Sequence, residues 1–193
     1  MLQKKYSIEK TIFVTVIFGT AFCTFIGLLF FGLDVFNTKH VAFQFLAYGI
    51  AGSISFAMFR QKRFRDLIFL LLLLFLLNLV IVDISEPSFV ITHLIFFAAV
   101  VFGIYLFAKY FYSKLENLRI ARLLILASIL SVMFVAATTL LWFIFSAGES
   151  QTSFLRNLPL GFLIGLGLGV GFEVAERSKK GAKFFDGKTH ENK

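Results

Sequence analysis

Four polar side chains in this sequence are the first candidates for binding a small ligand. Gln44, Asn78, Asp83 and His93 lie in or directly beside long apolar runs, where few other side chains donate or accept hydrogen bonds. Amide, carboxylate and imidazole groups are costly to bury in such surroundings and often bind ions, protons or polar solutes. If these groups bind a ligand, Gln44, Asn78 and His93 must converge from three helices, with Asp83 close enough to orient His93. The alternative is that each bonds to a neighbouring helix or to interfacial water.

The same region offers metal-ligand types, but their spacing does not specify a metal. His40, Asp83, Glu86 and His93 carry suitable donor atoms, whereas Cys23 is the single cysteine of the chain. A zinc site needs three or four converging ligands. The sequence contains neither an H-E-x-x-H nor a G-x-S-x-G motif. We therefore predict no metal, no cofactor and no catalytic residues, and the sequence favours a protein that is not an enzyme.

Glu173 is a separate candidate, because it is the one formally charged residue inside an apolar run. A carboxylate in this position could bind a cation or a proton as part of a gate. The alternative is an ion pair with Arg60, Arg63 or Arg122 at the end of the run.

The elements that would position these residues are helices long enough to cross a membrane. Of 193 residues, 59% are hydrophobic and 16% charged, whereas soluble domains average about 45–50% apolar and about 25% charged residues. A membrane-spanning helix needs about 20 mostly apolar residues. Six runs come near that length, at 11–33, 41–59, 67–82, 89–108, 123–145 and 158–175. We predict an all-α polytopic membrane protein with six transmembrane helices over 11–175, and with Pro159 in the first turn of the last helix.

The distribution of positive charge predicts how these helices are oriented. Of the 19 Lys and Arg, 17 fall in 1–10, 60–66, 109–122 and 176–193, whereas Lys39 and Arg156 fall in the other connections. Because positive loops stay in the cytoplasm, both termini are predicted to be cytoplasmic, in the inner membrane of a bacterium. The charge predicts attraction to the lipid bilayer and its anionic inner-leaflet lipids, and not to nucleic acid.

The sequence also predicts the character of the segments on the cytoplasmic side. Residues 1–10 form a cytoplasmic segment, and 176–193 form a basic tail that is expected to be disordered or to lie on the membrane surface. Tyr110 and Tyr112 suit aromatic anchors at the interface.

Small residues at four-residue spacing predict where helices pack, because close approach of backbones drives association in lipid. The run 158–175 has two such sets, which point to opposite sides of a helix and so place it between two neighbours. Gly161, Gly165 and Gly169 form one set, and Gly167 and Gly171 form the other. The leucine-rich run 67–82 is expected to face lipid.

Two functions fit this pattern. The first is a non-enzymatic transport or channel-type component, which requires a continuous polar path between the helices. The second is a structural or regulatory membrane protein that assembles with a second copy or with another membrane protein through small-residue helix faces. That function permits a dry interior, so the polarity of the interior separates the two.

Overall fold

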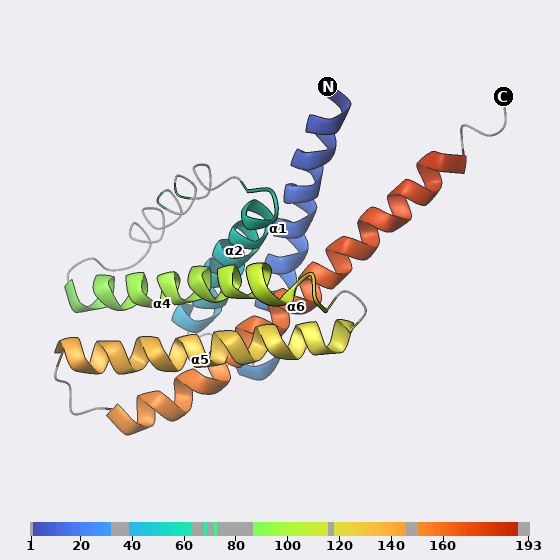
Figure 1. The fold of residues 1–193 in the computed structure, drawn as a ribbon. Helices are drawn as coiled ribbons and strands as arrows, with labels where there is room; N and C mark the ends of the chain where they lie inside the picture. Colours follow the sequence, from blue (N-terminus) through green and yellow to red (C-terminus); the bar gives the residue numbers. More distant parts are fainter. Residues whose placement is uncertain are drawn as a thin grey trace.

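The computed structural model describes residues 2–31, 39–62, 68, 72, 87–115, 118–145 and 150–188. All regular secondary structure in these residues is helical, which confirms the all-α class. The α-helices are α1 (Leu2–Phe31), α2 (Lys39–Arg60), α4 (Pro87–Leu106), α5 (Arg119–Phe145) and α6 (Ser150–Lys188), and a π-helical turn, η2 (Phe107–Phe111), extends α4 (Figure 1).

Four of the described segments are long and apolar enough to cross a membrane: Ile12–Phe30, Val90–Phe111, Arg119–Phe145 and Asn157–Arg177. These segments indicate an integral, multi-pass membrane protein. The apolar part of α2, Phe45–Arg60, is shorter. The run 67–82 lies outside the described residues except for Ile68 and Leu72, which are both exposed. Six crossings and cytoplasmic termini therefore stay predictions.

Helix α6 is longer at both ends than the sequence predicted. It begins at Ser150, so Pro159 lies inside the helix and not in its first turn. A proline there removes one backbone donor, while the rest of the helix keeps its own hydrogen bonds. Residues up to Lys188 continue α6, so the expectation of disorder was wrong for them. A position of this tail on the membrane surface stays a prediction. Glu, Ala, Arg and Lys follow the apolar run, and these residues favour helix even without an apolar face.

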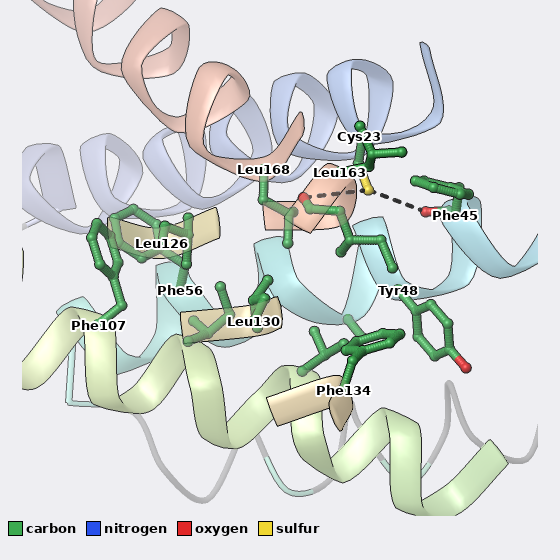
Figure 2. Packing of buried hydrophobic residues seen from close by; sticks show 14 of the residues in the cluster. Cys23, Phe45, Tyr48, Phe56, Phe107, Leu126, Leu130, Phe134, Leu163 and Leu168 are labelled. Carbon is green, nitrogen blue, oxygen red and sulfur yellow. Dashed lines mark hydrogen bonds between the residues drawn. The ribbon is translucent and has the colours of Figure 1, made fainter. Parts of the chain in front are cut away.

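The five α-helices pack in a closed order around one core. Helix α6 lies between α1 and α5, α2 packs against α1 and α4, and α4 packs against α5. A smaller contact joins α2 to α6 across the middle. Buried aliphatic and aromatic side chains from all five helices fill the centre (Figure 2).

Aromatic rings supply much of that core. Phe56 and Phe172 stack with ring centroids 4.0 Å apart and planes 7° from parallel. Phe134 packs edge-on against Tyr48 at 5.7 Å. Ring pairs of this kind add about 0.5–1.5 kcal/mol beyond the area that they bury. They fix α2 against α6 and α5 without polar contacts.

Candidate functional site

Charged side chains from three helices and one tyrosine converge at one end of the bundle. We name this group the charge cluster: Arg60 on α2, Tyr112 directly after η2, Arg122 on α5, and Glu173 and Glu176 on α6. Arg122 is only 4% exposed, although an unpaired charge at such a position is very costly. The cluster is therefore the clearest candidate for a functional site among the described residues.

Arg122 is the centre of the charge cluster. Its Nη1 donates to Glu173 Oε1 at 3.0 Å and to Glu176 Oε2 at 3.3 Å. Its Nε donates to the carbonyl oxygen of Leu115 at 2.8 Å, which ties the connection before α5 to the cluster. Charge-assisted bonds of this kind are the strong ones in proteins. One guanidinium thus joins α5, α6 and the segment that follows η2.

Tyr112 links the two arginines of the cluster. Its ring centroid lies 4.6 Å from Cζ of Arg60 and 4.5 Å from Cζ of Arg122, within the range of favourable cation–π contacts. Its hydroxyl bonds to Glu176, which also pairs with Arg60 at 2.8 Å. The sequence-based expectation that Tyr112 anchors the interface misses this role, because Tyr112 is half-buried within the cluster.

The π-helical turn explains how Tyr112 reaches the cluster. The amide of Tyr112 donates to the carbonyl of Phe107 at 3.0 Å, an i→i+5 bond that widens the turn. Phe107 is buried in the core, whereas Lys109, Tyr110 and Phe111 are exposed. The wide turn thus separates inward-facing from outward-facing side chains within a few residues.

A small cavity of about 10 Å³ lies beside the cluster and is lined by Phe107, Tyr112, Arg122, Leu123, Gly169, Phe172 and Glu173. One water molecule needs about 10–15 Å³. The cavity is therefore at the lower limit for one water and is far too small for an organic substrate.

The structure describes only some of the four predicted ligand residues. Gln44 lies on α2, in a part of the helix whose side chains are not described, and Asn78 and Asp83 lie outside the described residues. His93 lies on α4 and is half-buried. The shared ligand site stays a prediction. Across the described part of the chain, no group of three His, Cys, Asp or Glu could hold a metal ion.

Glu173 lies in an ion pair with Arg122, and its other oxygen is 4.0 Å from Nε of the exposed Arg119. Arg122 is one of the three arginines that the sequence offered as ion-pair partners of Glu173. Arg63, another partner considered, lies outside the described residues. Sequence reasoning missed Glu176 as a member of the site. Its position three residues after Glu173, on the same helix face, is the signal that could have found it.

The glycines of α6 lie at its contacts with two neighbouring helices. Ideal Cβ atoms on Gly161 and Gly165 would lie 2.6 Å from the Leu130 carbonyl oxygen and 2.5 Å from Cα of Ala127, both on α5. Gly169 faces Leu123, which is also on α5.

The second glycine set faces α1. Cβ atoms on Gly167 and Gly171 would lie 2.5 Å from Cα of Cys23 and of Gly19, respectively. Only glycine fits these positions without moving a backbone.

Comparison with known proteins finds no matching family model, no matching curated protein and no matching solved structure.

Proposed function

We propose that this chain is a non-enzymatic structural or regulatory membrane protein and not a conduit for solutes. The observation that carries the proposal is the filled centre of the bundle. Side chains such as Phe56, Leu130, Phe134, Ile164 and Leu168 occupy the space between the described helices and are almost completely buried.

Two of the buried hydroxyls in the described residues bond to backbone carbonyls. Ser131 donates to the Leu158 carbonyl at 2.9 Å, and Thr138 donates to the Phe134 carbonyl at 2.8 Å. These hydroxyls satisfy backbone groups, a common use of Ser and Thr in membrane helices. Ser53 and Ser55 are buried and have no hydrogen-bond partner. A path for ions or polar solutes would need polar groups that follow one another across the membrane.

The glycine faces of α6 are already used by α1 and α5, so assembly with another protein would have to use other surfaces. The helix ends offer one such surface. The first residues of α1 and the last residues of α6 lie on the same side of the molecule, where these two helices project past the others (Figure 1). These projecting segments hold Lys4, Lys5 and Lys10 on α1, and Lys179, Lys180 and Lys183 on α6. In the proposed function, the bundle is a rigid membrane anchor for these basic helical extensions.

One feature supports the alternative, transport. The charge cluster is a buried network of ion pairs at the end of the core, and such a network could form a closed gate. Opening such a gate would have to wet the core behind the charge cluster. Cys23 reports on this directly, since it is fully buried among α1, α2 and α6.

The test is therefore the reaction of Cys23 with N-ethylmaleimide in liposomes that contain the full-length protein. We expect no modification while the protein is folded and complete modification after unfolding in SDS. The control is Cys23→Ser combined with Lys114→Cys, which places an accessible thiol in the exposed turn after η2. Modification of Cys23 in the folded protein at a rate near that of the control would overturn the proposal and favour transport.

A further inference from the structure

The π-helical turn η2, which extends α4, carries an exposed lysine, Lys109, that contacts two tyrosines. Lys109 Nζ donates to the Tyr105 hydroxyl at 2.8 Å. It also lies 5.2 Å from the ring centroid of Tyr105 and 5.1 Å from that of Tyr110. The lysine is exposed, so its ammonium group is positioned by aromatic contacts and is still open to the surroundings.

Two phenylalanine rings contact the ring of Tyr105. Phe59 of α2 packs edge-on against its ring at 5.3 Å, and Phe102 lies against it at 6.2 Å, 28° from parallel. The π-helical turn then directs Lys109 and Tyr110 outward while Phe107 enters the core. The position of the ammonium group thus follows from the packing of α2, α4 and η2.

An apolar stripe leads along α4 to this lysine. Ile91, Leu94 and Phe102 are exposed on the outside of the helix at spacings that place them on one face. The apolar span of α4 and η2 ends at Phe111, two residues after Lys109. Tyrosine and lysine side chains near the end of a span are typical anchors at the level of the lipid headgroups.

No carboxylate neutralises Lys109 in the described part of the chain. Glu173 and Glu176 pair with Arg60, Arg119 and Arg122. The ammonium group has three donors and interacts with both Tyr105 and Tyr110. Its exposed side is open to an external anion.

We propose that Lys109, Tyr105 and Tyr110 form a binding site for the phosphate of an anionic glycerophospholipid, whose acyl chains lie along the outer face of α4. The ammonium group supplies the charge and the donors, and the tyrosine rings cover the glycerol region. The exposed apolar stripe supplies the contact for the chains. This site does not depend on the proposed structural role of the bundle.

The test uses native mass spectrometry of the purified full-length protein in detergent, titrated with phosphatidylglycerol. Lys109→Gln is expected to weaken binding about fivefold, the equivalent of about 1 kcal/mol for a basic residue at a membrane surface. Tyr105→Phe removes only the hydroxyl partner and is expected to weaken binding less. Lys114→Gln is the matched control, because it removes an exposed lysine without this tyrosine arrangement and is expected to leave binding within twofold.

Two further probes distinguish the ligand. Phosphatidylcholine is expected to bind weakly and equally to the original protein and the Lys109→Gln variant, and inorganic phosphate is expected not to compete with phosphatidylglycerol. Unchanged binding in Lys109→Gln, or an equal loss in Lys114→Gln, would overturn the site. Competition by inorganic phosphate at matching concentrations would overturn the lipid as its ligand. An unchanged thermal midpoint of Lys109→Gln is the check that the variant is folded.

Discussion

Adding one methyl group to Gly165 should weaken the contact between α5 and α6. A Cβ at this position would lie 2.5 Å from Cα, 2.9 Å from the amide nitrogen of Ala127 and 3.0 Å from the Leu126 carbonyl oxygen. Carbon atoms pack best at about 3.5–4.0 Å, so the two backbones would have to separate by about 1 Å. All three neighbours are backbone atoms, which cannot move aside as a flexible side chain can.

The expected magnitude follows from two opposing effects. Overpacking of a filled contact costs about 1–3 kcal/mol, whereas replacing glycine by alanine inside a helix recovers up to about 1 kcal/mol. We therefore expect Gly165→Ala to lower the free energy of unfolding by about 1–2 kcal/mol. For a chain of this size, that loss lowers the thermal midpoint by roughly 2–8 °C. Gly165→Leu should prevent recovery of the folded protein.

The assay heats detergent-purified variants and measures the folded fraction by size-exclusion chromatography. Ala136→Leu is the control, because Ala136 is exposed on α5 and added bulk there meets no helix of this chain in the described structure. The control should keep a midpoint close to that of the original protein. A Gly165→Ala midpoint at or above that of Ala136→Leu would refute the packing of α6 against α5.

The charge cluster and the orientation of the helices give the remaining predictions. Arg122→Ala leaves two carboxylates without their shared partner and should lower stability by about 3–5 kcal/mol. Arg119→Ala removes an exposed, 4.0 Å contact and should cost no more than about 1 kcal/mol. Equal midpoints for these two variants would show that the buried pair is not formed. In a cysteine-free background, a cysteine at Lys39 should react with an impermeant thiol reagent added outside intact cells, whereas one at Lys62 should not. The reverse pattern would invert the predicted orientation.

The helices could be predicted from the sequence, because an apolar run of membrane length is visible in a short stretch of residues. The ends of α6 were not. The apolar run ends before Glu176, but helix propensity and local hydrogen bonding continue the helix to Lys188. Pro159 was predicted in the first turn of the last helix because the start of that helix was placed where the apolar run begins. The helix itself begins earlier, at Ser150, among polar residues.

The charge cluster was predicted only in part, because its members are far apart in the sequence. Glu173 was recognisable as a charge in an apolar run, and Arg122 as one of several partners. The involvement of Tyr112 and Glu176 depends on the π-helical turn and on the contact between α5 and α6, which no local pattern specifies. Tyr110 and Tyr112 look equivalent in the sequence, but the turn places only Tyr112 in the cluster.

The central claim is that the centre of the bundle stays dry, and the most direct measurement of it is the reactivity of Cys23 under a driving force. A proton gradient and a membrane potential, imposed in turn on proteoliposomes, would populate the open states of any transport cycle. We predict that N-ethylmaleimide leaves Cys23 unmodified under both conditions, while SDS exposes it completely. Modification that appears only when the gradient or the potential is applied would contradict the account, because it would show that water enters the core between α1, α2 and α6.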